Sequence, residues 1–505
     1  MSWKEAAEPV LTRLPAVERP TGHVPFKRKL GWTAGVLVLY FFLTNVPIYG
    51  LLQGEGSDVF GQFRSILGGN QGSLLQVGIG PIVTASIVLQ LLGGADLLGL
   101  DTEENPRDQA LYQGLQKFLV IVMTALTAAP MVFAGFLVPD GDIATSLGIS
   151  VTALSWLMFA QVFVGGMMIL YMDEIISKWG VGSGIGLFII AGVSQRLIGG
   201  FLSWEGLGSG YIGFFPQWYG ILVGATELGS PLTMSGLSDL FLDEGRLLAL
   251  ITTLLIFVVV VYAESVRIEI PLSHARVKGA RGRFPVKLIY ASVLPMILVR
   301  ALQANIQFLG RILVSQFSNE SNVIVLFGQS LPWLGQYNDP SGGGFAQPIG
   351  GLFYYLAPIY SPGDWMWWLG QTSAEPWQIM IRLGVDLTFM VIGGAIFAVF
   401  WVETTGMGPT ATAKQIQNSG MQIPGFRQSP GVTEKVLERY IPQVTVIGGA
   451  LVGLLAVMAN MLGTIGQVTG TGLLLTVSIT YKLYEEIAEE QLMEMYPMMR
   501  EMFGD

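Results

Sequence analysis

The stretch that decides the fold is Gly72–Leu91, which reads GSLLQVGIGPIVTASIVLQL and contains no charged residue. At 1.5 Å of rise per residue, a helix of about 20 residues crosses the ~30 Å hydrocarbon layer of a bilayer. Within it, Gly80-Pro81 weakens the helix, because proline has no N–H to donate and its ring clashes with the preceding turn. The stretch predicts a membrane span that is either an ordinary kinked helix or a broken helix lining a cavity.

Composition extends this prediction to the whole chain. Hydrophobic residues make up 51% of the 505 residues and charged residues 12%, about half the ~25% charged residues of a typical soluble domain. The mean hydropathy is +0.55. Residues 1–30 lack the apolar core of a cleaved signal peptide, so the first apolar run is expected to be a permanent span. Ten spans are predicted, at 31–52, 74–93, 112–138, 151–172, 184–202, 246–263, 286–309, 378–401, 440–462 and 468–484.

Two segments do not fit this pattern. Asp58–Leu67 is too short and too polar to span, and it lies inside the glycine-rich run Gly54–Gly72. Glu205–Leu242 is also rich in glycine, which predicts either a loop or a partly inserted segment.

The distribution of Lys and Arg predicts the orientation in the membrane. Three consecutive bases, Lys27–Lys29, precede the first span, which places the N-terminus in the cytoplasm, and ten spans return the C-terminus there. The loop 264–287 carries six basic residues against two acidic ones, and the loop 402–439 is also basic, so both are expected in the cytoplasm. The connection 310–377 has one base against four acids and is expected outside.

Groups for catalysis or metal binding are few. The chain has no Cys, and His23 and His274 lie far apart, which excludes thiolate sites and a His-Glu-x-x-His zinc motif. Two function classes stay open on the residues alone: a secondary transporter, which needs a polar site at the membrane midplane, and an intramembrane enzyme, which needs Ser or Asp chemistry. In the eighth span, Arg382 and Asp386 are four residues apart, a spacing at which they can pair with each other. We expect no enzyme activity, no metal and no cofactor.

A family resemblance decides between these classes. Gly72–Leu91 is similar at essentially every position to the first signature of the SecY family, and Tyr171–Phe188 (YMDEIISKWGVGSGIGLF) looks like its second signature. The similarity continues through Ala280–Gln307, Gly425–Pro442 and Gly470–Glu486. It is to the archaeal type, and the balance of 36 acidic against 27 basic residues favours a halophile over a merely acidic tail.

The resemblance implies an all-α membrane protein of about ten transmembrane helices, in two pseudo-symmetric halves of five, with a short re-entrant plug helix. The implied divisions are a cytoplasmic N-terminal segment 1–30, an N-terminal half 31–202 with the plug at about 58–67, a connecting loop 203–245, a C-terminal half 246–484 and an acidic cytoplasmic tail 485–505.

The resemblance also implies four sets of site residues. The family's pore is closed by a ring of apolar side chains, here Ile79, Val83, Ile185, Ile189, Ile297 and Leu475. The plug residues are Asp58, Val59, Phe60, Phe63, Arg64, Ile66 and Leu67. The lateral gate between the second and seventh spans includes Thr84 and Asn305, with Thr127 at the matching position of the third span. Ribosome contacts are implied for Arg276, Lys278, Arg281, Arg283, Lys414 and Arg427.

The implied function is a passive one. The family's channel conducts unfolded secretory proteins across the cell membrane and releases hydrophobic segments sideways into membrane lipid. The implied partners are SecE-type and SecG/Secβ-type small membrane subunits in a heterotrimer, the ribosome, and nascent secretory and membrane polypeptides. Positive charge in the cytoplasmic loops also follows from membrane topology alone, so those bases do not by themselves require a ribosome.

Overall fold

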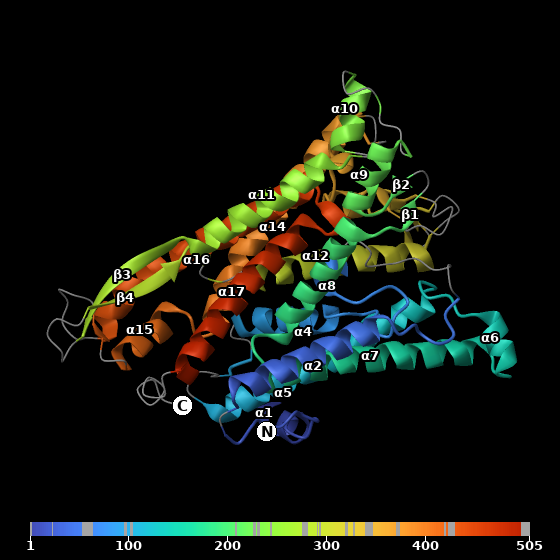
Figure 1. The fold of residues 1–505 in the computed structure, drawn as a ribbon. Coiled ribbons are helices and arrows are strands. Elements are labelled where there is room, and N and C mark those ends of the chain that lie inside the picture. The colour runs from blue at the N-terminus through green and yellow to red at the C-terminus, as the bar shows by residue number, and fades with distance from the viewer. Residues whose placement is uncertain are drawn as a thin grey trace.

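The structure is a computed structural model of the chain, and it is mostly helical (Figure 1). The helices of the first half, blue to green in Figure 1, pack along those of the second half, coloured lime to red. The structure describes residues 3–22, 24–52, 64–94, 98–100, 105–207, 210–225, 229, 233–242, 245–274, 281–289, 291, 294–318, 322–326, 329–338, 347–369, 374–418, 421–422 and 430–495.

In the described part of the chain, ten helices correspond to the ten predicted spans, which confirms the predicted fold class. Seven helical segments of the described part are long and apolar enough to cross a membrane. Three of the ten helices are not among these seven. α2 starts with basic residues, α4 is short, and the second half of α17 is acidic. The ten are α2 (Phe26–Thr44), α4 (Gly80–Gly94), α5 (Pro106–Phe133), α7 (Val151–Trp179), α8 (Gly184–Leu202), α11 (Leu247–Ser265), α12 (Leu294–Gln316), α14 (Pro376–Thr404), α16 (Pro430–Leu462) and α17 (Gly470–Met495).

The second span is a broken helix rather than a kinked one. Residues 74–79 form successive turns, and α4 begins only at Gly80. Gly78 adopts a left-handed φ of 61°, which glycine accepts without strain, and Pro81 lies in the first turn, where its missing N–H costs nothing. The sequence Gly78–Pro81 therefore ends the run of turns and starts the helix.

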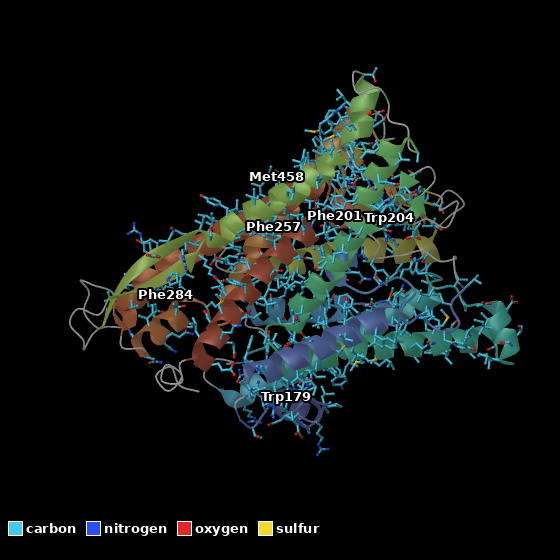
Figure 2. The ribbon with its side chains drawn as sticks, in the orientation of Figure 1. Trp179, Phe201, Trp204, Phe257, Phe284 and Met458 are labelled. Carbon is cyan, nitrogen blue, oxygen red and sulfur yellow. The ribbon has the colours of Figure 1, made fainter. Side chains whose placement is uncertain are left out.

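Large apolar side chains are exposed on the outer faces of these helices. Phe257 on α11 is 55% exposed, Met458 on α16 is 50% exposed, and Trp204, just beyond α8, is 63% exposed (Figure 2). Extensive exposed apolar surface is unfavourable in water and is what a bilayer covers. These faces agree with the assignment of the helices as membrane spans.

Shorter elements connect the spans. The short helices are α1 (Trp3–Leu11), α3 (Arg64–Leu67), α6 (Gly141–Ser146), α9 (Phe214–Val223), α10 (Met234–Phe241), α13 (Leu352–Tyr355), α15 (Pro409–Asn418), η2 (Pro362–Asp364), η3 (Trp367–Leu369) and η4 (Ile465–Gln467). The strands are β1 (Gly206–Leu207), β2 (Gly210–Tyr211), β3 (Arg267–His274), β4 (Arg281–Lys287), β5 (Val325–Leu326), β6 (Gln329–Ser330), β7 (Gln336–Tyr337), β8 (Pro348–Gly350) and β9 (Met421–Gln422). The connection 205–242 therefore contains the β1–β2 hairpin and two short helices.

A small antiparallel sheet is the main addition to the predicted helices. β3 and β4 pair along their length, from Arg267 opposite Lys287 to Ser273 opposite Arg281. The alternating pattern Arg267-Ile268-Glu269-Ile270 is typical of a strand, because successive side chains point to opposite faces. β9, from the loop 402–439, pairs with the end of β3, so the sheet joins the two basic loops.

Close backbone contact joins α14 and α16 in the second half. A Cβ added at Gly449 would lie 2.5 Å from Gly394 O, and one added at Gly453 would lie 2.3 Å from Met390 O. Small residues let membrane helices approach this closely, and the contact then gains dispersion energy along both helices. These glycines therefore allow the close spacing of α14 and α16.

Candidate functional site

An apolar cluster fills the region where helices of the two halves meet. It contains Ile79, Val83, Ile189, Ile297 and Leu475, each at most 2% exposed. Ile185 is partly buried and packs against the same cluster. These side chains come from the start of the second span and from α8, α12 and α17; all six belong to or pack against this one large core cluster, and Val83, Ile185 and Ile297 line a common cavity beside it.

The end of the predicted plug segment belongs to the same cluster. Ile66 and Leu67, at the end of α3, are 1% and 4% exposed. Leu67 O accepts a hydrogen bond from Ile79 N at 2.7 Å. A Cβ at Gly78 would lie 2.2 Å from Leu67 O, so glycine is needed where the two segments touch. For Arg64 the structure describes the backbone alone, and Asp58, Val59, Phe60 and Phe63 lie outside the described residues.

A cavity of about 250 Å³ adjoins the cluster, between the ends of α4, α5, α8, α12 and α14. Three ring residues line it, Val83, Ile185 and Ile297. The rest of its wall is mixed polar and apolar: Ser86, Gln90, Tyr112, Gln116, Ser183, Leu294, Leu298, Trp401, Thr404 and Thr405. The polar side chains of the wall can hold water, whereas the neighbouring apolar cluster cannot. The cavity therefore has the composition of a vestibule that ends at a dry constriction.

One hydrogen bond connects α4 with α12 at the positions predicted for the gate. Asn305 Nδ2 donates to Thr84 Oγ1 at 2.9 Å, and Thr84 Oγ1 in turn donates to Gly80 O. The third predicted member, Thr127, donates instead to Met123 O in its own helix and is not part of this bond. A polar contact from α5 to α4, which the sequence did not single out, joins Gln116 Nε2 to Ser86 Oγ at 3.4 Å.

The basic loops lie at one end of the molecule, together with α1 and the end of α17 (Figure 1). Arg281 and Arg283 are in β4, and Lys414 is in α15. The structure describes the backbone of β4 at these positions, while Arg276, Lys278 and Arg427 lie outside the described residues. The β3–β9 pairing brings the two loops into one sheet.

A buried polar network in the second half corrects the predicted Arg382–Asp386 pair. Asp386 Oδ1 accepts from Arg300 Nη1 at 3.3 Å, and both side chains are at most 1% exposed. Arg382 turns away and donates to Ala357 O and Pro358 O at 3.0 and 2.7 Å. A charge within a membrane span is costly unless it is paired, so Asp386 pairs with the more deeply buried arginine.

Sequence analysis did not single out Arg300, although it is a charged residue within the seventh span. It also donates to Gln303 Oε1 at 2.6 Å and to Thr471 Oγ1 on α17 at 3.3 Å. Gln303 Nε2 donates both to Asp386 and to Leu356 O of the connection after α13. The signal that could have found Arg300 was its position three residues after the ring residue Ile297.

The second signature string forms a fixed corner between α7 and α8. Asp173 Oδ1 accepts from Ile185 N at 2.9 Å, which satisfies an N–H of the first turn of α8. Glu174 Oε1 accepts from Lys117 on α5 at 2.8 Å and from Lys178 at 2.5 Å. The corner positions Ile185 at the edge of the cluster. In the described part of the chain, no group of three or more acidic or His side chains could hold a metal ion.

Comparison with protein families gives two matches. A family model described as SecY matches residues 73–484, and a model described as the plug domain of Sec61p matches residues 38–72. The protein translocase subunit SecY of Haloferax volcanii is 72% identical to this chain, over 100% of both chains. The subunit of the same name from Halobacterium salinarum is 69% identical, over 100% of this chain and 99% of its own.

Solved structures give the same result at lower identity. A structure described as a protein conducting channel has a TM-score of 0.76 and 37% identity, and covers 97% of this chain and 98% of its own. Sec61 in the canine ribosome-channel complex from the endoplasmic reticulum has a TM-score of 0.73 and 36% identity, with the same coverage. Both matches extend over the two halves and the central cluster alike.

Proposed function

This chain belongs to the SecY family. From that membership we propose which of its residues form the seal, the lateral gate and the ribosome contacts of a translocation channel. It is the central channel-forming subunit of a Sec translocon of the halophilic archaeal type. Such a channel conducts unfolded secretory proteins and releases hydrophobic segments laterally into the bilayer. The alternative of a secondary transporter is wrong, because the matched relatives are translocase subunits and the matched structures are protein-conducting channels.

The apolar cluster acts as the seal of the pore. The observation that supports this assignment is that the six side chains, from four spans, belong to or pack against one buried core cluster, and that three of them line a cavity with a partly polar wall. A narrow apolar ring excludes water when it is empty and surrounds a passing chain without binding it tightly. Leu67, bonded to Ile79 through its carbonyl, adds the plug to this seal from the other side.

The hydrogen bond between Asn305 and Thr84 stabilises the closed state of the lateral gate. A polar pair between membrane helices contributes only about 0.6 kcal/mol on average, which suits a contact that must open for each inserted segment. Thr127 takes no part in this hydrogen bond, since its hydroxyl donates to Met123 O in its own helix.

The basic loops face the cytoplasm and dock the ribosome, and both termini lie on that side. The bases Lys27–Lys29 before the first span and the basic loops at the same end of the molecule support this orientation. The matched canine Sec61 was seen in a ribosome-channel complex, which supports the same partner here. The relatives are named as subunits, which supports SecE-type and SecG/Secβ-type small membrane partners in the cell membrane.

The test uses cysteine cross-linking, because the chain has no native Cys. A secretory chain with one Cys is stalled in proteoliposomes that contain channels with Ile297→Cys. The control is Val38→Cys on α2, where the side chain is 69% exposed on an outer face. A disulfide with Ile297→Cys and none with Val38→Cys is expected. Equal reaction at both positions, or reaction only at Val38→Cys, would contradict the assignment of the pore.

A further inference from the structure

The segment that returns from the plug lies against the end of α2. On the outer part of this contact the backbones bond to each other: Ile48 N donates to Gly72 O and Leu74 N donates to Val46 O, both at 2.8 Å. On the inner part, next to the seal, the backbone of Gly68 and Gly69 faces a side chain instead. That side chain is Tyr40.

Tyr40 is buried and packs against α8. It is 1% exposed on α2, and its ring stacks on Phe188 of α8 with centroids 4.8 Å apart. Its hydroxyl oxygen accepts a hydrogen bond from Gly69 N at 3.2 Å, in a buried setting. Gly69 follows Leu67 and Gly68 in the chain. The carbonyl oxygen of Leu67 accepts the hydrogen bond from Ile79 N of the seal.

The two glycines explain why the anchor has to come from α2. Gly68 and Gly69 both have left-handed φ values, 71° and 76°, which residues with side chains avoid. A Cβ at Gly68 would lie 2.7 Å from the Tyr40 hydroxyl, and one at Gly69 would lie 2.2 Å from Leu75 O. The turn Gly68–Gly69 therefore has no side chains that could contact its surroundings. The Gly69 N–H donates to the Tyr40 hydroxyl instead.

We propose that Tyr40 is the positioning residue of the plug: its hydroxyl fixes the exit turn Gly68–Gly69, and thereby Leu67, against the seal in the closed channel. The proposal rests on the plug function assigned above and adds to it the contact that must break when the plug leaves. A neutral hydrogen bond such as that from Gly69 N is weak enough to be broken in each opening, while the stacked ring stays in the core.

The competing explanation is that Tyr40 only fills space between α2 and α8. The two explanations differ in what the hydroxyl does. Tyr40→Phe keeps the ring and its stacking on Phe188 but leaves the buried Gly69 N–H without this acceptor, so the closed arrangement alone loses stability. Tyr49→Phe is the matched control, because it removes a hydroxyl from an outer residue that is 53% exposed.

The experiment measures the resting ion conductance of purified channel complexes in planar bilayers. Tyr40→Phe is expected to raise the open fraction about fivefold, the change that corresponds to one ordinary hydrogen bond, while Tyr49→Phe leaves it unchanged. The same variant is expected to translocate a substrate with a weakened signal sequence better than wild type. A purely structural defect would lower translocation of every substrate instead.

Deletion of 58–67 separates the failure of this proposal from failure of the plug function. If the deletion leaks and Tyr40→Phe does not, with an unchanged melting temperature, the anchor assigned to Tyr40 is wrong. If the deletion itself conducts no more than wild type, the plug function is wrong and the proposal falls with it. Loss of translocation of all substrates by Tyr40→Phe would also overturn the proposal, in favour of a space-filling role.

Discussion

Separating Arg300 from Asp386 gives the sharpest prediction for stability. Both charges lie inside the second half of the channel, where they are at most 1% exposed and 3.3 Å apart. Asp386→Leu leaves the guanidinium of Arg300 without its counter-charge, and Arg300→Met does the same to the carboxylate. The double variant removes both charges and replaces them with side chains suited to an apolar core.

The structure sets the expected magnitudes. Removing one partner of a buried pair costs about 3–5 kcal/mol, because the other charge stays buried without compensation. In the double variant neither charge of the pair is left. Ile359 N loses its acceptor Asp386 Oδ2, and Gln303 Oε1 loses its donor Arg300 Nη1, but each of these losses also occurs in one of the single variants, at about 1–3 kcal/mol. Gln303 Nε2 keeps Leu356 O as an acceptor. The double variant is therefore expected to be more stable than either single one.

Thermal unfolding of the purified complex in lipid nanodiscs, followed by tryptophan fluorescence, measures this order. Lys29→Met is the control, since Lys29 pairs with Glu490 at a more exposed site, with side chains 22% and 29% exposed. Such a pair contributes about 0–1 kcal/mol and less in high salt. Single variants of the buried pair that melt like the control, or a double variant that loses the sum of both single losses, would refute the reasoning.

Three further predictions concern the gate, the helix packing and the basic loops. A Thr84→Cys, Asn305→Cys double variant should form a disulfide that stops insertion of hydrophobic segments, while failure to cross-link in resting and engaged channels alike would show that the gate is misplaced. Gly453→Leu should lower thermal stability by about 1–3 kcal/mol or more through overpacking against α14, whereas Gly384→Leu, where an added Cβ meets open space, should not. Reversing the predicted ribosome-contact bases should weaken ribosome binding and reduce its salt dependence; wild-type affinity in that variant would leave topology as the sole reason for these bases.

The sequence predicted well whatever depends on local pattern. The ten spans follow from apolar length, while the chemistry of glycine and proline predicted a weak point at Gly80-Pro81 and left a kinked and a broken helix both open. The six ring residues come from the family resemblance, with which the i, i+4 spacing of Ile79 and Val83 agrees, and their role as a ring stays a prediction. The alternating residues of β3 also carried a strand signal, although the prediction was limited to helices.

Contacts between distant elements could not be predicted in this way. Spacing alone suggested that Asp386 pairs with Arg382, but the packing of α12 against α14 offers it the more deeply buried Arg300. Thr127 was assigned by position to the gate, and its hydroxyl donates to Met123 O within α5. The bond from Gly69 to Tyr40 joins residues 29 apart through a turn of two glycines, and a single sequence gives no sign of it.

The central claim is that six apolar side chains seal the pore of this channel. The most direct test is the resting conductance of a triple variant, Ile79→Asn, Ile185→Asn, Ile297→Asn, as purified complex in a planar bilayer. Polar groups at the constriction stabilise water there, so a lasting leak of ions is predicted in the absence of a translocating chain. A triple variant that folds, assembles and stays as tightly closed as wild type would contradict the assignment of the seal.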